Sequence, residues 1–376
     1  MNPRGASADI PDPSRRRPTG PVPVRQVLDI PPQRLMATEH RCPRCRKTVQ
    51  APFPAEAPVP VGYGPHFKGW LTYAHVHQLI PLARLSQMCQ DLFGAPVSPA
   101  TIQKVIVDAD QSLDAFSQAL EQELLAAPLA HADETGIRVD RSLAWLHVLS
   151  TPTLTWYGVH AHRGGIALSE FDLLPRFRGR LIHDCWAPYF AYDIPQGLCN
   201  APLCRELVFV EEVLGQAWAR PLRLFLEDAL SAASIHRECQ TAFSPEELSL
   251  LSARYDELIA QGWAENPLPD PGPKRRGRPK RSKAQNLLFR MEHHKESILA
   301  FLADLSVPFT HNLAERDLRM LKVKQKISGC FRTFPGAKRF AKVRSYISTA
   351  VKNGQNILGA LTEAFLGTPF IPSRAP

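Results

Sequence analysis

The feature that most constrains the fold is a change in the spacing of apolar residues at residue 129. Residues 65–127 repeat apolar side chains every three or four positions, as helices do. The next stretch predicts three alternating strands, a helix, a buried strand that ends at residue 184, and a fifth short strand. Helical spacing returns from residue 205, and we expect one final helix over residues 338–366. This order of elements predicts an α/β fold with a mixed sheet.

The charge balance favours a polyanionic partner. The 376 residues carry a formal net charge of +9, and the sequence pI is about 9.2. Nucleic acid is the common polyanion that basic proteins bind. No apolar run reaches the roughly 18 residues of a membrane-spanning helix, and the N-terminus lacks the apolar core of a signal peptide. We therefore expect a cytoplasmic protein without a membrane partner.

The two segments ahead of residue 129 differ in composition. Residues 1–60 are rich in Pro and Arg and contain a single C-x2-C pair, Cys42 and Cys45. Structural zinc commonly takes its ligands from two such pairs, so we expect an arm with a partial zinc knuckle and leave open whether Zn²⁺ binds. Residues 61–128 predict short helices, one of them starting at Ser98. They could form a DNA-binding helix-turn-helix or an ordinary helical hairpin.

Three acidic residues stand at positions that suit metal-dependent phosphodiester chemistry. Asp133 lies in the first predicted strand, Asp184 at the end of a buried strand, and Glu315 on a helix after a long gap. Such carboxylates can converge on two hard cations about 3.5–4 Å apart, which stabilise the attacking and the leaving oxygen. Spacing alone does not select this trio. Aspartates at strand ends often cap turns, and Glu134 or Asp140 could serve in a different register.

Two basic segments are candidates for contacts with DNA. Residues 273–283 hold seven Lys and Arg in eleven positions, around a core that resembles an AT-hook. This run could enter a minor groove or be a solvated linker that touches phosphates without preference. The second segment is the helix of Glu315, where Asn312 is the expected cap and Arg319 could pair with Glu315 or contact a phosphate. The candidate DNA-binding residues are Arg275, Arg276, Arg278, Lys280, Arg281, Arg316, Arg319, Lys322 and Lys324.

The motifs around the carboxylates are more specific than their spacing. In chain order they are HADETGIRVD at 131–140, LIHDCWAPY at 181–189, LCNAPLCREL at 198–207 and HNLAERDLRMLKVKQKISGCFRT at 311–333. Together with residues 63–102 and the basic linker, they resemble the ordered motifs of the insertion-sequence 66 family of transposases. The resemblance extends over about residues 22–365.

The resemblance implies an RNase H-like mixed-sheet core that is interrupted by a mostly helical insertion. Its parts would be core residues 129–204, insertion residues 205–308 with a basic linker at 266–285, and core residues 309–376 with a C-terminal helix. It also implies that Asp133, Asp184 and Glu315 form a D-D-E catalytic set that binds Mg²⁺ or Mn²⁺. The implied partners are the DNA ends of the element, target DNA, further copies of the chain in a synaptic complex, and accessory proteins of the same element.

Three departures from the family pattern leave the function open. Members usually have a longer helical N-terminal region with two cysteine knuckles, the chain is short for the family, and Pro202 stands where members commonly have histidine. The main hypothesis is a DNA transposase that cleaves the ends of its element and transfers strands. The alternatives are a catalytically inactive truncated remnant that binds DNA and a standalone RNase H-like nuclease.

Overall fold

The computed structural model describes residues 40–41, 48–49, 62–268 and 281–373. The chain divides into two compact units, Met1–Pro60 and Val61–Pro376. In the first unit, β1 (His40–Arg41) pairs antiparallel with β2 (Thr48–Val49). Cys42 and Cys45 lie outside the described residues, so the partial zinc knuckle stays a prediction.

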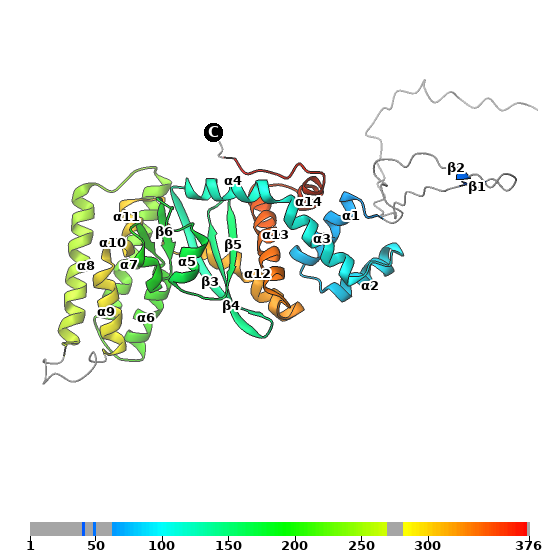
Figure 1. Ribbon diagram of the computed structural model, residues 1–376. Helices are drawn as coiled ribbons and strands as arrows, with labels where there is room; N and C mark the ends of the chain where they lie inside the picture. Colours follow the sequence, from blue (N-terminus) through cyan, green and yellow to red (C-terminus); the bar gives the residue numbers. More distant parts are fainter. Residues whose placement is uncertain (1–39, 42–47, 50–61, 269–280, 374–376) are drawn as a thin grey trace, which may run out of the picture. The chain divides into compact units, whose positions relative to one another are not determined.

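A five-stranded mixed sheet forms the centre of the second unit (Figure 1). Its strands are β3 (Leu129–Val139), β4 (Ser142–Ser150), β5 (Thr155–His160), β6 (Arg180–His183) and β7 (Gln196–Leu198). They lie in the order β5-β4-β3-β6-β7, with antiparallel pairs on the β5 side of β3 and parallel pairs on the β7 side. The predicted α/β class is confirmed, and this strand arrangement is that of an RNase H-like core.

A two-residue turn joins β3 to β4 and sets their register. Asp140 and Arg141 have φ values of 45° and 65°, as the left-handed positions of a type I′ hairpin turn require. Asp133 then pairs with Val148, and Glu134 pairs with His147. Because successive side chains on a strand point to opposite faces, this register decides which acidic residues share a face.

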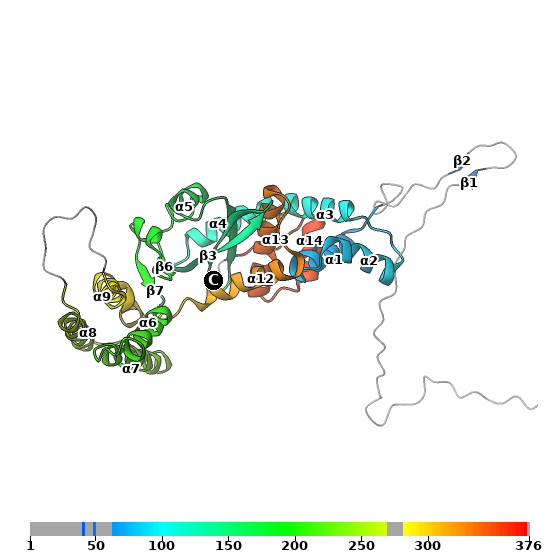
Figure 2. The same ribbon diagram turned by 90° about the horizontal axis from the view of Figure 1, so that it is seen from below.

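Helices cover both faces of the sheet. On one face, α12 (Asn312–Ser328) and α13 (Phe334–Lys352) pack against the strands, and the Tyr157 hydroxyl donates to the Asp317 carbonyl oxygen at 2.8 Å. On the other face lies α5 (Gly165–Phe171), where the Phe171 ring contacts the rings of His147 and Trp156. Figure 2 shows α5 and α12 on opposite sides of the strands. A side chain on β3 therefore faces either α12 or α5.

A helical segment precedes the sheet. It comprises α1 (Pro65–Thr72), the π-helix η2 (Tyr73–His77), α2 (Leu82–Phe93), α3 (Pro99–Ser112) and α4 (Asp114–Leu125). The start of α3 is confirmed, because the Ser98 hydroxyl accepts from the Thr101 backbone N–H at 3.1 Å. Gly94 ends α2 with a φ of 56°. Buried side chains of α1, α2 and α3 form a small apolar cluster of their own.

A mostly helical insertion separates β7 from α12, as predicted. Its helices are α6 (Asn200–Glu212), α7 (Ala219–Glu238), α8 (Pro245–Glu265), α9 (Lys283–His293), α10 (Lys295–Ile298) and α11 (Ala300–Ala303). They enclose an apolar cluster that includes Trp218, Tyr255 and Leu287. None of the helices described is long and apolar enough to cross a membrane.

The single final helix expected over residues 338–366 is wrong. The chain bends after α13 at Gly354, which has a φ of 69°. A separate helix, α14 (Ile357–Phe365), then begins with the Asn356 side-chain oxygen accepting from the Gly359 N–H at 2.8 Å. The apolar spacing runs through the bend, so it does not reveal that α14 turns to pack against α1.

Candidate active site at the junction of β3, β6 and α12

Asp133 and Asp184 are neighbours because β3 and β6 pair in parallel. The register aligns His131 with Ile182. Two further steps along both strands bring Asp133 level with Asp184, and adjacent strands lie about 4.8 Å apart. Burial and the negative charge of Asp133 raise the pKa of Asp184 above its ordinary value. The two carboxylates therefore interact electrostatically.

A sharp turn presents Asp184 at the end of β6. The next residue, Cys185, has a φ of 70°, which residues with a side chain seldom adopt. The Trp186 backbone N–H then donates to Oδ1 of Asp184 at 3.2 Å. The unusual backbone and this hydrogen bond hold the Asp184 carboxylate at the end of β6, beside Asp133.

Glu315 reaches the same region from the first turn of α12. His311, just before the helix, is 2% exposed. Its Nε2 lies 3.8 Å from Oδ2 of Asp133 and 3.7 Å from Oε1 of Glu315. Burial acts to lower the pKa of His311, but the neighbouring Asp133 and Cys199 side chains raise it to about 10. The His311 imidazole contacts two of the three carboxylates.

The start of α12 differs from the expectation. His311 occupies the N-cap position instead of Asn312, and no side chain makes a capping hydrogen bond there. The His311 backbone N–H donates to Sγ of Cys199 at 3.4 Å, and the Asn200 backbone N–H donates to the Phe309 carbonyl oxygen at 2.9 Å. These bonds tie residues 309–311 to the start of α6, which explains why His311 is buried beside Asp133.

Pro202 fits its position in the fold. It is in the first turn of α6, which begins at Asn200. A backbone N–H in the first turn has no partner within the helix, so proline removes no intrahelical bond there. The departure from the family histidine therefore leaves the helix intact.

Glu134 does not substitute for Asp133, because the two side chains lie on opposite faces of β3. Oε2 of Glu134 accepts from the Tyr189 hydroxyl at 2.6 Å, and Oε1 accepts from Nε and Nη2 of Arg163 at 2.9 and 2.7 Å. Burial raises the pKa of Glu134, against the opposing effects of Tyr189 and Arg163. Asp140 is excluded by its place in the hairpin turn, about 23 Å along β3 from Asp133 at about 3.3 Å per residue.

The three carboxylates have the donor chemistry that Mg²⁺ or Mn²⁺ requires. Hard divalent cations prefer carboxylate oxygens. Within the described ranges, no group of three or more His, Cys, Asp or Glu side chains is arranged to hold a metal ion. The site thus fits the cation in its chemistry, while His311 is the group in contact with Asp133 and Glu315.

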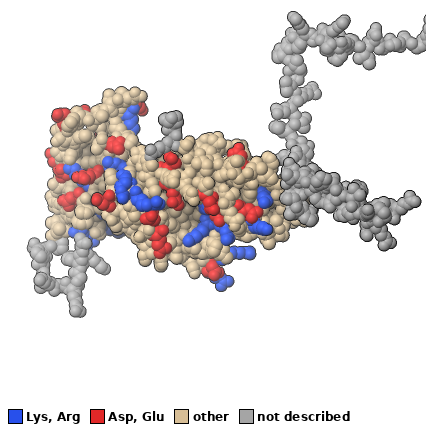
Figure 3. Space-filling view, turned by 45° about the horizontal axis from the view of Figure 1, so that its top comes forward, with Lys and Arg blue, Asp and Glu red and all other residues tan. Residues whose placement is uncertain are grey.

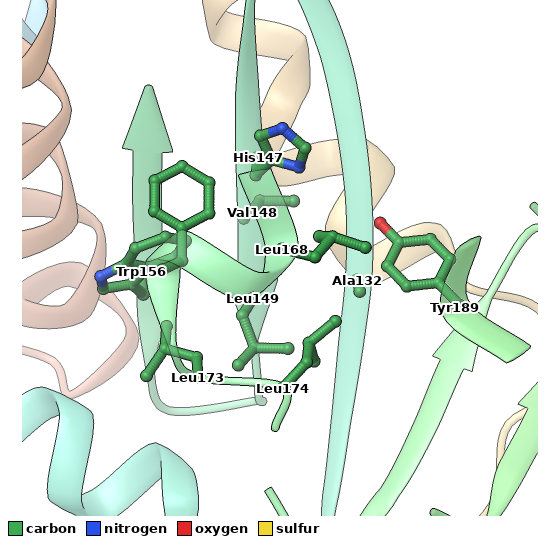
Figure 4. A pocket seen from close by; sticks show the side chains of 10 residues that line it. Ala132, His147, Val148, Leu149, Trp156, Leu168, Leu173, Leu174 and Tyr189 are labelled. Atoms are coloured by element: carbon green, nitrogen blue, oxygen red, sulfur yellow. The ribbon is translucent and has the colours of Figure 1, made fainter. Parts of the chain in front are cut away.

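A small apolar pocket supports β3 from the α5 face (Figure 4). Its lining includes Ala132, His147, Trp156, Leu168 and Tyr189. A cavity volume of about 20 Å³ has room for about one water molecule, so this pocket is a packing feature and not a ligand site. Burial lowers the pKa of His147 to about 4, so this imidazole is neutral.

Three of the predicted DNA-binding residues, Arg316, Arg319 and Lys322, are exposed on α12. Among the residues described, the ionic partner of Glu315 is His311 and not Arg319. Lys324 is only 5% exposed, and its Nζ lies 3.7 Å from the centroid of the Phe331 ring, so we leave it out of the proposed DNA surface. On the face shown in Figure 3, acidic and basic side chains are interspersed, so net charge does not mark a DNA path there.

The basic run at 273–283 is described only from Arg281 onward. Arg275, Arg276, Arg278 and Lys280 lie outside the described residues, so both interpretations of this run stay predictions. The guanidinium carbon of Arg281 lies 3.9 Å from the centroid of the Phe289 ring. This contact holds Arg281 at the start of α9.

Sequence reasoning missed His311 and Arg163. The histidines beside the aspartates, His131 and His183, are buried, and burial lowers the pKa of each to about 4. His311 is the histidine that contacts the carboxylates. Its place four residues before Glu315, one helical turn away, is the local signal that could have marked it.

Comparison with known protein families decides the class of the protein. The sequence profile of the family described as "Transposase IS66 family" matches residues 61–339. The chain belongs to this family. The matched range includes all three candidate carboxylates, and membership makes DNA the substrate class of this IS66-family chain. A comparison with curated proteins gave no match.

Proposed function

We propose that this IS66-family chain is the catalytic subunit of a transposase that cleaves the ends of its element and joins them to target DNA. The proposal assigns the D-D-E catalytic set to Asp133, Asp184 and Glu315. The observation that carries it is the parallel register of β3 with β6, which makes the two aspartates neighbours. The contacts of His311 with both Asp133 and Glu315 bring in the third carboxylate from the far end of the sequence.

Mg²⁺ or Mn²⁺ is the cofactor that this donor set suits. Such cations, when bound, stabilise the charge that develops on the attacking and leaving oxygens of a phosphodiester. The chain itself orients the carboxylates through backbone donors. The Glu134 N–H donates to Oδ1 of Asp133 at 2.8 Å, and the Trp186 N–H does the same for Asp184. The His311 imidazole lies within 4 Å of both Asp133 and Glu315.

The exposed cations of α12 are the proposed track for the DNA backbone. Arg316, Arg319 and Lys322 follow Glu315 on the same helix, and phosphate contacts of this type set the register of a DNA strand on a protein. Arg319 lies about one helical turn from Glu315, which suits it to a phosphate close to the one that reacts. The basic run at 273–283 would add salt-sensitive DNA affinity, whether it enters a minor groove or touches phosphates without preference.

Several parts of the proposal concern assembly. The element ends and the target would be held by more than one copy of the chain in a synaptic complex, with accessory proteins of the same element. Zn²⁺ at Cys42 and Cys45 would stabilise the N-terminal arm. These assignments come from the family and from the C-x2-C spacing.

The second candidate function is DNA binding without chemistry. It is favoured by the finding that, in the part of the chain described, no three-ligand metal group is assembled. Such a chain would occupy element ends and modulate an intact transposase. Products of strand cleavage distinguish the two functions.

The test is a cleavage and joining assay with labelled DNA that carries the ends of the element, in Mg²⁺ or Mn²⁺. We expect both products from the wild type and neither from Asp133→Asn, Asp184→Asn or Glu315→Gln. Each variant should still bind DNA, because an amide keeps the shape of the side chain and loses only its charge. Asp140→Asn is the matched control and should keep both activities, since Asp140 lies in the distant hairpin turn.

Each outcome bears on a different part of the proposal. Retained chemistry in one of the three variants would remove that residue from the catalytic set. DNA binding by the wild type without any product would favour the noncatalytic function. Cleavage without joining would favour a standalone nuclease.

A further inference from the structure

Arg163 connects the two strands that carry the proposed catalytic aspartates. Its Nε and Nη2 donate to Glu134, the residue that follows Asp133 on β3. Its guanidinium carbon also lies 4.4 Å from the ring centroid of Trp186, two residues after Asp184. We propose that Arg163 is a positioning residue for the Asp133 and Asp184 carboxylates, a role that rests on the proposed catalytic function.

The two residues that Arg163 contacts, Glu134 and Trp186, each donate a backbone hydrogen bond to one of the two aspartates. The Glu134 N–H donates to Asp133 at 2.8 Å, and the Trp186 N–H donates to Asp184 at 3.2 Å. A shift of either Glu134 or Trp186 moves the donor that orients the neighbouring carboxylate. Arg163, from the α5 face, holds both of these residues at once.

Arg163 contacts aromatic and acidic side chains from three parts of the structure. The guanidinium carbon lies 4.9 Å from the ring centroid of Trp145 and 4.4 Å from that of Trp186, within the range of cation–π contacts. Glu134 is 1% exposed and also accepts from Tyr189, which lies on the 3-10 helix η3 (Ala187–Ala191) just after Asp184. The buried Glu134 carboxylate therefore accepts hydrogen bonds from Arg163, in the loop after β5, and from Tyr189, on η3 after β6.

Two glycines follow Arg163 in its loop, and the loop backbone is held by its neighbours, with the His162 N–H donating to Nδ1 of His160 at 3.0 Å. These glycines are Gly164 and Gly165, and a Cβ at either position would have no atom within 4 Å. The side chain of Arg163 is itself 41% exposed. The side chain itself is held by its two hydrogen bonds to Glu134 and by its contacts with the two rings. A lysine at this site would keep the charge and lose both the fork and the flat stacking surface.

A purely electrostatic role predicts the opposite effect on cation binding. A positive charge close to Asp133 and Asp184 repels a divalent cation, so its removal would tighten cation binding if charge were its only effect. A positioning role predicts weaker binding, because residues that orient metal-binding groups typically change metal affinity about 10- to 100-fold. The sign of the change separates the two roles.

The test measures Mn²⁺ binding to the full chain by electron paramagnetic resonance of free Mn²⁺. We expect Arg163→Gln and Arg163→Lys each to raise the Kd about tenfold or more. Arg176→Gln is the matched control and should leave the Kd unchanged, because Arg176 is a similarly exposed arginine (47%) paired with the exposed residues Glu121 and Asp172. Thermal unfolding establishes that each variant is folded, and Arg163→Lys carries the test if Arg163→Gln does not fold.

The outcomes separate this inference from the proposed function. Tighter or unchanged Mn²⁺ binding in folded Arg163 variants would overturn the positioning role. The catalytic assignment would then still stand if Asp184→Asn weakens Mn²⁺ binding. Equal Mn²⁺ affinity of the wild type and Asp184→Asn would overturn the catalytic assignment and the positioning role with it.

Discussion

Replacing Lys352 by methionine should destabilise the α/β unit, because Lys352 ties three elements together. Its Nζ donates to Oδ2 of Asp317 on α12 at 2.7 Å. It also donates to the carbonyl oxygens of Thr151 and Leu154, in the turn between β4 and β5, at 2.9 and 3.0 Å. The variant keeps the length of the side chain and removes all three bonds.

The magnitude follows from the burial of this ion pair. The side chains of Lys352 and Asp317 are only 13% and 12% exposed. Removing one partner of a buried pair typically destabilises a protein by about 3–5 kcal/mol, because the other charge is left uncompensated. The Thr155 hydroxyl still donates to Asp317 at 3.2 Å, so the carboxylate keeps one hydrogen bond and the loss lies at the lower end of this range. We therefore expect a loss of about 3 kcal/mol in the free energy of unfolding.

Urea unfolding at pH 7 measures this loss where circular dichroism and tryptophan fluorescence give coincident transitions. Lys342→Met is the matched control, since the side chain of Lys342 is more exposed (24%) and pairs with the largely exposed Asp114 and with Asp110, and should cost less than about 1 kcal/mol. A double-mutant cycle with Asp317→Asn should show coupling of at least about 1 kcal/mol. Equal effects of Lys352→Met and Lys342→Met would refute the reasoning.

Two further predictions concern charge. Burial lowers the pKa of Lys324 to about 8, below the value of about 10.4 for an unfolded chain. The unfolded state therefore holds more protons between these values, and wild-type stability should rise as pH increases from about 8 to about 10.4. Thermal melts should show this rise in Lys322→Met and not in Lys324→Met; a rise in both would contradict it. Neutralising Arg316 and Arg319 to Gln should reduce the slope of DNA affinity against salt concentration by about 0.9 per lost phosphate contact. Neutralising the basic residues of 274–283 should reduce this slope further. An unchanged slope would exclude these contacts.

Much of the fold could be predicted because it depends on short-range patterns. The alternation that begins at residue 129 predicts strands, and the Ser98 cap predicts the start of α3, since both signals involve residues a few positions apart. Apolar spacing alone does not predict the bend at Gly354, because the spacing continues across it. The local signals for the bend are Gly354 in a left-handed conformation and the Asn356 cap, and the tertiary structure adds the packing of α14 against α1.

In the candidate site, too, some features are predicted by local motifs and others depend on tertiary contacts. Sequence motifs single out Asp133, Asp184 and Glu315, and the structure makes the two aspartates neighbours and links Asp133 to Glu315 through His311. The sequence alone leaves Glu134 open as an alternative ligand. The β3–β4 register removes it, because Glu134 faces α5 and its carboxylate is taken by Arg163 and Tyr189.

By itself, the sequence determined the order of strands and helices, the α/β class and the family, because these are recorded in periodicity and in contiguous motifs. Tertiary structure alone decided that Lys324 is buried, that His311 contacts the carboxylates and that Arg163 bridges β3 to the turn after β6. Each of these depends on residues far apart in the chain that meet only when strands pair in one register and helices pack on one face. A one-residue shift of register would move every side chain of β3 to the opposite face, and no local pattern specifies that choice.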